Sequence, residues 1–315
     1  MANPGRAYDL VVWGGSGFTG RLAAEYLARR YTPGGSVGVG SVAATEPVRW
    51  AIAGRDRVKL EKVRDEIEQK HPHARNKIDV LVGSLDDPQS LLRVASSTNT
   101  LLTFAGPFAL HGMPVVDACV TCGTVRIGPF PNTTLFSITR LTLSFIYRKD
   151  YCDITGEPTF IRDVIDKHES NLVNGDGTSP CIVNCVGYDS VPWDLGAWAV
   201  TKYLKQKHDA TCYEAFGHTG KSKGGVSGGT IASALHLMAN TPMATMKRMG
   251  SPHFLTKNEQ GPSDNDTKKR WATQSGAMYD EDLKRWTMPS VMAGINTKGT
   301  YCTYQIPPPC LPIRD

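Results

Sequence analysis

The chain has 315 residues, of which 40% are hydrophobic and 21% are charged, a composition typical of a soluble globular protein with a substantial core. Its formal net charge is +5, and the basic residues do not gather into a tract, so the sequence predicts no nucleic-acid binding. The eight cysteines are irregularly spaced, and we interpret them as buried thiols of a reducing compartment rather than as a metal site.

The sequence predicts neither export nor membrane insertion. Residues 1–8 are polar and lead directly into the first predicted strand, which is unlike a secretory signal. No uncharged apolar window reaches about 18 residues, the length that would span a bilayer. We therefore expect a cytoplasmic protein.

Predicted strands and helices alternate from residue 8 onward. The strands are expected at 8–13, 49–54, 78–82, 100–104, 151–154 and 181–186, and the helices at 21–30, 56–70, from 88, 114–122 and 191–207. This alternation is typical of an α/β protein with a doubly wound parallel sheet. The sequence thus predicts a Rossmann domain over residues 1–210.

The pattern changes at residue 211. A strand at 212–217, a glycine-rich turn at 224–229 and a helix at 230–238 precede a polar loop at 251–270. We interpret 211–298 as a smaller, truncated α+β domain, and the Pro- and Cys-rich residues 299–315 as a tail outside it.

A glycine-rich loop follows the first predicted strand and opens the first helix. It consists of Gly14, Gly15, Ser16, Gly17, Phe18, Thr19 and Gly20, and it fits the Gly-x-Gly-x-x-Gly dinucleotide fingerprint in the required strand-to-helix context. Glycines there let the backbone approach a pyrophosphate, whose charge lies at the helix N-terminus. The alternative is an ordinary tight turn.

The end of the second predicted strand distinguishes NAD from NADP. A carboxylate at this place binds the ribose 2′-hydroxyl, whereas an arginine favours a 2′-phosphate. Here Gly54 is followed by Arg55, a planar donor suited to phosphate. We expect NADP (NADPH) as the cofactor, the alternative being that Arg55 is a solvated surface residue.

The loops after the third and fourth predicted strands begin at the carboxyl ends of these strands, the edge at which cofactors bind in open α/β sheets. They place Asp86, Gly106 and Pro107 among the expected cofactor contacts. Asp86 is expected either to meet the adenine amino group or to cap the following helix, and the sequence does not decide between the two.

Four segments resemble the saccharopine dehydrogenase-like oxidoreductases, a family that includes the trans-acting enoyl reductases. They are GGSGFTG at 14–20, WAIAGR at 50–55, YCDITGEP at 151–158 and GYDSVPWDLG at 187–196. The resemblance implies a nicotinamide-dependent reductase fold in which a partner domain closes over the cofactor. It further implies a lipid-like enoyl or keto substrate in glycolipid metabolism and peripheral association with lipid droplets or another membrane. A homodimer is among the assemblies we expect.

The last two motifs supply the candidate catalytic residues. Glu157 follows a strand end, where a carboxylate can act as acid or base, although the same residues suit a helix start at Pro158. Tyr188 is a candidate proton donor, and Asp189 is a candidate for orienting it or the nicotinamide amide. The alternative for this motif is a helix cap by Asp189 or Ser190.

Two function classes therefore stand side by side: an NADP-dependent oxidoreductase, and a nucleotide-binding structural or regulatory protein without turnover. A short-chain reductase is disfavoured, because Tyr147 and Tyr151, which lie next to the fifth predicted strand, are followed four residues on by Tyr151 and Thr155 instead of lysine.

Residues 125–149 lengthen the connection between a predicted helix and strand beyond the usual span. We interpret them as a retained intron, since Val125 codons begin with GT and a Lys149 codon can end in AG. The alternative is an amphipathic, lipid-docking insertion. Genomic DNA in which the Lys149 codon is AAA would contradict the intron hypothesis.

Overall fold

The computed structural model describes residues 6–34, 48–123, 150–172, 180–212, 215–220, 225, 227–256, 276–290 and 292–305. The predicted insert at 125–149 lies outside these residues, as do 257–275 and 306–315. The chain forms two compact units. The first comprises Met1–Thr155, Asp163–Asn184 and Ser227–Ser233, and the second comprises Gly156–Arg162, Cys185–Val226 and Ala234–Asp315. The predicted domain boundaries at 210 and 298 stay predictions.

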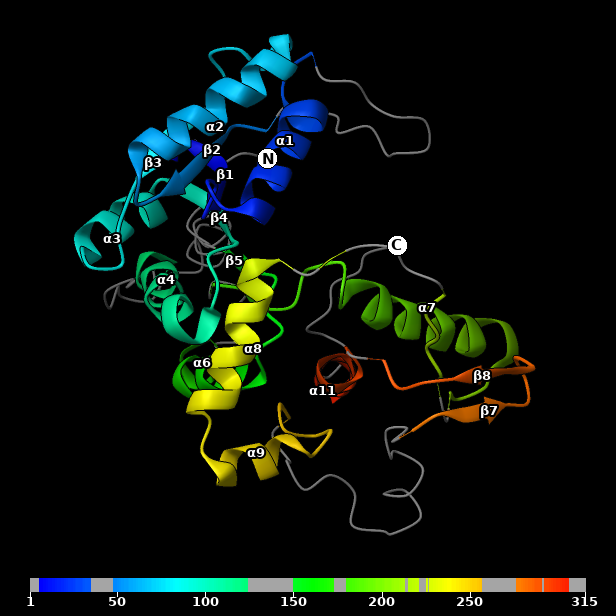
Figure 1. Cartoon of the computed structure of the whole chain (residues 1–315). Helices are drawn as coiled ribbons and strands as arrows, with labels where there is room; N and C mark the ends of the chain where they lie inside the picture. The colour runs from blue at the N-terminus through cyan, green and yellow to red at the C-terminus, as the bar shows by residue number, and fades with distance from the viewer. Residues whose placement is uncertain are drawn as a thin grey trace, which may run out of the picture. The chain divides into compact units, whose positions relative to one another are not determined.

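A six-stranded parallel sheet forms the centre of the first unit (Figure 1). Its strands are β1 (Tyr8–Trp13), β2 (Trp50–Gly54), β3 (Asp79–Val82), β4 (Thr98–Thr103), β5 (Asp150–Asp153) and β6 (Ile182–Val183). Every pair is parallel, and the strand order is β3-β2-β1-β4-β5-β6. The predicted doubly wound sheet is therefore confirmed, with the strand order of a Rossmann fold.

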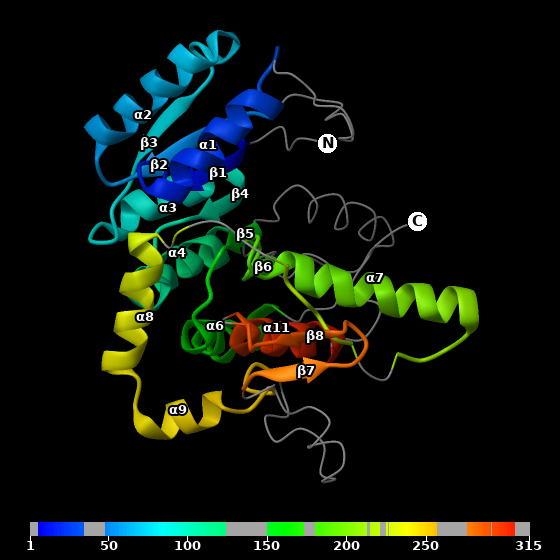
Figure 2. The same cartoon turned by 45° about the vertical axis from the view of Figure 1, so that its right-hand side comes forward.

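Helices connect successive strands of this sheet. They are α1 (Phe18–Tyr31), α2 (Arg57–Lys70), α3 (Pro88–Ser96), α4 (Phe108–Gly123) and α6 (Pro158–Leu172), with a short turn η1 (Pro72–Ala74) before β3. Figures 1 and 2 show α1 beside α2, and α3 beside α4. Ion pairs join the first two helices, from Arg21 to Glu66 and from Lys70 to Glu25.

The core of the first unit lies between β1, β2 and the helices α1 and α2. Residues of the central strands and of the inner stripes of both helices are buried in this core, among them Val12, Ala24, Ala28, Ile52, Leu60, Val63 and Ile67. The alanines on α1 let the helix approach the sheet closely, while the larger side chains of α2 fill the remaining space. Each fully buried Leu or Ile contributes about 1.5–3 kcal/mol, so this interface fixes the two strands that carry the glycine loop.

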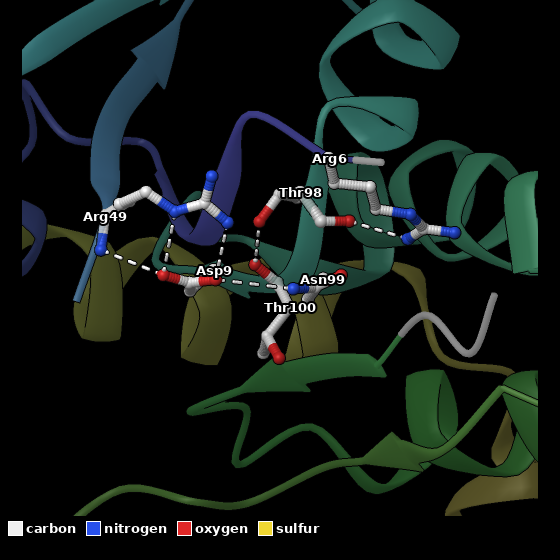
Figure 3. Close-up of polar contacts among 6 residues, drawn as sticks. All are labelled: Arg6, Asp9, Arg49, Thr98, Asn99 and Thr100. Carbon is white, nitrogen blue, oxygen red and sulfur yellow. Dashed lines mark hydrogen bonds and ion pairs between the residues drawn. The ribbon is translucent and has the colours of Figure 1, made fainter. Parts of the chain in front are cut away.

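The amino-terminal edge of the sheet is held by a charged network (Figure 3). Asp9 on β1 accepts hydrogen bonds from the backbone N–H of Arg49 at 3.0 Å, from its guanidinium at 3.0 and 3.4 Å, and from Asn99 at 3.5 Å. Burial works against the charged form, but the bonds and charge of Arg49 outweigh it and hold the pKa of the Asp9 carboxyl below its usual value. The network ties β1 to the entry of β2 and to β4.

Replacing Asp9 with asparagine is expected to lower the free energy of unfolding by about 1 kcal/mol at neutral pH, the upper range for a partly exposed ion pair. A depressed pKa contributes stability above the unfolded-state value, and that contribution disappears as pH falls through the folded-state value. The difference between Asp9→Asn and the unmodified chain in urea titrations should therefore shrink below about pH 4. A difference that stays constant to pH 2 would contradict this.

The second unit is mostly helical and carries a small antiparallel sheet. Its elements are α7 (Val191–His208), the greater part of α8 (Gly228–Asn240), α9 (Met243–Met249), α11 (Ala293–Gln305), and the paired strands β7 (Met278–Asp280) and β8 (Arg285–Thr287). The mixed helix-and-strand character predicted for the second part of the chain is confirmed. In the part of the chain that is described, no helix is both long and apolar enough to cross a membrane.

Two local expectations differ from the structure. The strand predicted at 212–217 is wrong for its described residues, which are not in a strand. Pro114 was expected to start a helix but lies inside α4, which begins earlier at Phe108.

Candidate functional site

The strand order reverses between β1 and β4, and the loops that leave these two strands lie against each other. A Cβ placed on Gly14 would be 3.0 Å from the backbone nitrogen of Ala105 and 3.2 Å from the carbonyl carbon of Phe104. In open α/β sheets, the crevice at such a reversal, outside the carboxyl ends of the strands, is where ligands bind. The sequence-predicted contacts at 14–20 and at 106–107 therefore flank one place.

The backbone of the glycine loop is fixed to β2. The N–H groups of Gly14 and Gly15 both donate to the carbonyl of Ala53, at 2.9 and 3.1 Å, and the N–H of Gly17 donates back to Gly14 at 2.9 Å. Gly14 has φ +80°, a conformation that residues with a side chain rarely adopt. The loop is thus a tight turn with its own internal hydrogen bonds.

The other glycines serve two different purposes. A Cβ on Gly15 would lie 2.9 Å from the Ile52 side chain, and one on Gly20 would lie 2.2 Å from the carbonyl oxygen of Gly14. These two positions are glycine because the loop packs against β2 and α1. A Cβ on Gly17 would meet only the Gly14 carbonyl oxygen, at 3.3 Å. Gly17 is exposed, so a side chain there would extend into the space in front of the loop.

The N-terminus of α1 has the features that suit an anion. Gly17 is its N-cap residue, no side chain caps it, and its first turn contains no acid. The first N–H groups of a helix have no partner within the helix, and the helix dipole adds partial positive charge there. Phe18 is 72% exposed, so the end of the helix is not covered by its own first residue. A pyrophosphate fits the chemistry of this cradle; the contacts predicted for Ser16, Phe18 and Thr19 stay predictions.

Arg55 lies at the end of β2, exposed to solvent. Its basic neighbours Arg57 and Lys59 pair with Glu61 and Asp56, at 3.3 and 3.4 Å. Across the described residues, Arg55 itself has no hydrogen bond or ion pair. Its guanidinium is therefore available to an anion.

The carboxylate next to Arg55 is occupied elsewhere. Asp56 is the N-cap of α2, and its side chain accepts the backbone N–H of Lys59 at 3.0 Å. That backbone hydrogen bond, followed by the side-chain bond and charge of Lys59, holds the pKa of Asp56 below its usual value. Because the carboxylate is turned into the helix cap, it does not take the place of an acid that would bind the ribose 2′-hydroxyl.

The loop after β3 decides one open question about Asp86. The cap of α3 is the next residue, Asp87, whose side chain accepts the N–H groups of Gln89 and Ser90 at 3.1 and 3.2 Å. The alternative that Asp86 caps this helix is therefore wrong. Asp86 is exposed beside Ser84, and its contact with an adenine stays a prediction.

The loop after β4 reaches the same edge. The N–H of Ala105 bonds to the Thr103 hydroxyl at 3.3 Å, and that of Gly106 bonds to the Phe104 carbonyl at 3.2 Å. The Gly106–Pro107 peptide is cis. The cofactor contacts of Gly106 and Pro107 stay predictions.

A buried polar cluster at the end of β5 went unrecognised in the sequence. Asp153 is completely buried, and it accepts hydrogen bonds from the Tyr151 hydroxyl at 3.0 Å, the Thr155 N–H at 3.0 Å and the Asn184 amide at 2.6 Å. Burial, and then the charge of Asp153, raise the pKa of Tyr151 far above its usual value. The Tyr-x-Asp spacing was the available signal, because residues two apart on a strand share a face.

The candidate catalytic residues lie in the second unit. Glu157 is buried and directly precedes α6, whose first residue is Pro158, so the helix start proposed for this motif is confirmed. Tyr188 is 88% exposed. The catalytic roles of Glu157 and Tyr188 stay predictions.

The second motif also starts a helix. Ser190 is the N-cap of α7 and Pro192 lies in its first turn, although the serine side chain makes no capping bond. Asp189 is not the cap. It is exposed, and its carbonyl accepts a hydrogen bond from the Asn296 amide at 2.8 Å. The helix start explains why Ser190 and Pro192 occur here. It does not explain the side chains of Tyr188 and Asp189.

The strand order defines a fold of the Rossmann class, and its glycine loop lies at the reversal, where such folds bind ligands. The resemblance predicted from the four motifs is confirmed: the chain is similar to trans-acting enoyl reductases and to saccharopine dehydrogenase-like oxidoreductases. No family model matches the chain.

The similarity covers most of the chain in the bacterial relatives. The trans-acting enoyl reductase of Mycobacterium leprae is 27% identical over 303 residues, which are 95% of this chain and 61% of that protein. A Mycobacterium tuberculosis protein, provisionally named for the same activity, is 28% identical over 300 residues, or 93% of this chain and 60% of its own length. The mouse saccharopine dehydrogenase-like oxidoreductase is 31% identical over 201 residues, which are 62% of this chain and 38% of that protein. The chain thus spans about 60% of the length of the bacterial relatives it matches.

Among solved structures, an apo L-Glu-forming saccharopine dehydrogenase from Saccharomyces cerevisiae aligns with 63% of this chain and 32% of its own, with a TM-score of 0.38 and 12% identity. At that level the fold is defined by the strand order of this chain, not by the alignment.

Proposed function

We propose that this chain binds NADP(H) and acts as an NADP-dependent oxidoreductase on a lipid-like enoyl or keto substrate. The observation that carries the proposal is the glycine loop at the β1–β4 reversal, together with Arg55, which has no ionic partner in the described part of the chain. The ion pairs of most surface arginines contribute little to stability. An arginine without an ion pair at the end of β2, however, lies where NADP-binding folds recognise the 2′-phosphate.

The proposed cofactor contacts follow from this arrangement. Backbone N–H groups at the start of α1 would hold the pyrophosphate, Arg55 the 2′-phosphate and Asp86 the adenine amino group, while Gly106 and Pro107 would line the opposite wall. When bound, the nicotinamide supplies or accepts the hydride that such reactions need. Tyr188 is proposed to donate a proton to the reduced substrate, Asp189 to orient it, and Glu157 to act as acid or base.

The substrate class rests on the names of the relatives, several of which are trans-acting enoyl reductases. We extend this to a lipid-like enoyl or keto group, to glycolipid metabolism, and to a cytoplasmic protein peripherally associated with lipid droplets or another membrane. A homodimer is the proposed assembly.

The cofactor proposal predicts a large effect of Arg55→Ala on NADPH binding and a small one on NADH. Losing one charge-assisted contact to phosphate costs roughly 1.5–3 kcal/mol, or about 10- to 150-fold in affinity. Titration calorimetry with both nucleotides measures this. Arg57→Ala is the matched control, since Arg57 is already paired with Glu61.

Equal affinities of the unmodified chain for NADPH and NADH would contradict the NADP assignment. The competing interpretation, a nucleotide-binding protein without turnover, is tested with the same preparation. Tight NADPH binding without oxidation of the cofactor, across enoyl-thioester and keto-lipid substrates, would favour it over an enzyme.

A further inference from the structure

Polar side chains line up across the carboxyl ends of three neighbouring strands in the first unit. Thr103 on β4 is in register with Asp153 on β5. Cys152 is in register with Val183 on β6, so the next residue, Asn184, lies beside Asp153. Thr103 and Asp153 are buried, whereas Asn184 is only half-buried. The row ends, at β6, in the one member of the three that solvent can reach.

Asp153 cannot itself touch a ligand, because it is completely buried. An ionised carboxylate only accepts hydrogen bonds, and this one receives them from the Tyr151 hydroxyl, the Thr155 backbone and the Asn184 amide. Three donors around one carboxylate make a rigid anchor. Asp153 can therefore affect a ligand only by orienting the side chains that donate hydrogen bonds to it.

Asn184 is the exposed group that Asp153 orients. The side-chain amide has one donor end and one acceptor end, and a carboxylate can bind only the donor end. The bond of 2.6 Å from Nδ2 of Asn184 to Asp153 therefore turns Oδ1 away from the carboxylate. Among the described residues, that oxygen has no hydrogen-bond donor. A fixed carbonyl acceptor is thus presented at the end of β6.

This acceptor lies in the half of the sheet that the adenosine part of a dinucleotide does not use. The glycine loop and Arg55 follow β1 and β2, whereas Asn184 follows β6, on the other side of the β1–β4 reversal. A dinucleotide lies across such a reversal, with one nucleotide over each half of the sheet. With the 2′-phosphate at Arg55, the nicotinamide half of the cofactor would lie over the carboxyl ends of β4, β5 and β6.

We propose that Asn184 binds the nicotinamide carboxamide, with its Oδ1 accepting a hydrogen bond from the carboxamide NH₂, and that Asp153 is the positioning residue that orients Asn184. The inference rests on the proposed NADP binding and deepens it, because it assigns the recognition of the nicotinamide end. A carboxamide donor matches a fixed carbonyl acceptor in chemistry.

Two probes separate the halves of the site: NADPH, and adenosine 2′,5′-bisphosphate, which carries the 2′-phosphate but no nicotinamide. Asn184→Ala is expected to weaken NADPH binding roughly 2- to 12-fold, the range for one hydrogen bond, and to leave the bisphosphate affinity unchanged. The fluorescence of bound NADPH should change in the same variant, since it reports the surroundings of the nicotinamide. Asp153→Asn should reproduce the selective loss, because two amides no longer fix the orientation of Asn184.

Asn99→Ala is the matched control, since Asn99 lies at the amino-terminal edge of the same sheet, bonded to Asp9. It should leave both affinities unchanged. The binding data for Asp153→Asn count only if the thermal unfolding of this variant stays cooperative. If it does not, the binding data for Asn184→Ala, at a half-buried position, test the proposal alone. Equal weakening of both probes by Asn184→Ala, or an unaltered NADPH affinity and fluorescence, would overturn this inference alone. An unmodified chain that binds neither probe would overturn the proposed function together with it.

Discussion

Replacing Gly17 with valine is expected to reduce NADPH binding below detection while the chain stays folded. An added Cβ at this position meets only the Gly14 carbonyl oxygen, at 3.3 Å, and the residue has no positive φ that a side chain would strain. The valine side chain would instead occupy the exposed space at the start of α1, where the pyrophosphate is proposed to bind. Titration of NADPH, paired with a thermal melt, measures both halves of the expectation.

Gly196→Val is the control for this substitution. Gly196 lies on α7, and an added Cβ there meets nothing within 4 Å. The control variant should bind NADPH as the unmodified chain does. Normal NADPH binding by Gly17→Val would show that the loop is only a turn, and an unfolded Gly17→Val would show that Gly17 serves packing instead.

Gly20→Ala, in contrast, should lower the stability of the fold, and NADPH affinity should fall as a consequence. Its Cβ would lie 2.2 Å from the Gly14 carbonyl oxygen and 3.0 Å from the Cα of Gly15, so α1 must move away from the loop. Overpacking of this kind costs about 1–3 kcal/mol, or roughly 2–12 °C in melting temperature for a unit of this size. NADPH affinity should fall as well, because the displaced helix end no longer faces the pyrophosphate.

A matched glycine on an exposed helix face gives the reference. Gly196→Ala introduces the same methyl group without a clash, and alanine favours a helix over glycine by about 0.5–1 kcal/mol. The two Gly→Ala variants should therefore move the melting temperature in opposite directions. A Gly20→Ala chain as stable as the unmodified one would refute the close packing of α1 on the loop.

The half of the fold that contains the glycine loop was predictable from the sequence because its signals are local. A run of apolar residues predicted β1, the helical spacing of apolar residues predicted α1, and the glycine spacing between them predicted the loop. The boundary between β2 and α2 followed from Gly54 and from the residues after it. Each of these features depends on residues within a few positions of one another, so no knowledge of the tertiary contacts was needed.

The predictions were wrong or incomplete where two local signals competed, or where contacts between residues distant in sequence determine the structure. Asp86 and Asp87 are both acids before a proline, and only the geometry shows that Asp87 makes the cap of α3. Pro114 suggested a helix start, but the apolar residues from Phe108 onward extend α4 through it. The cluster around Asp153 was missed because one of its donors, Asn184, is separated from it by 31 positions in sequence.

The catalytic candidates lie beside helix starts, which the same residue types favour. Residues such as Ser190 and Pro192 are what any helix start prefers, so the motif around Tyr188 and Asp189 reads equally as a cap and as a site. The structure assigns the cap to Ser190 and leaves Tyr188 exposed. A role in proton transfer for Tyr188 is thus compatible with its position and depends on the substrate.

A crystal structure of the chain in complex with NADP tests the central claim most directly. The account predicts the pyrophosphate within hydrogen-bond distance of the backbone N–H groups at the start of α1, and the 2′-phosphate on the guanidinium of Arg55. A dinucleotide bound away from the glycine loop, or a 2′-phosphate in solvent with Arg55 turned aside, would contradict it.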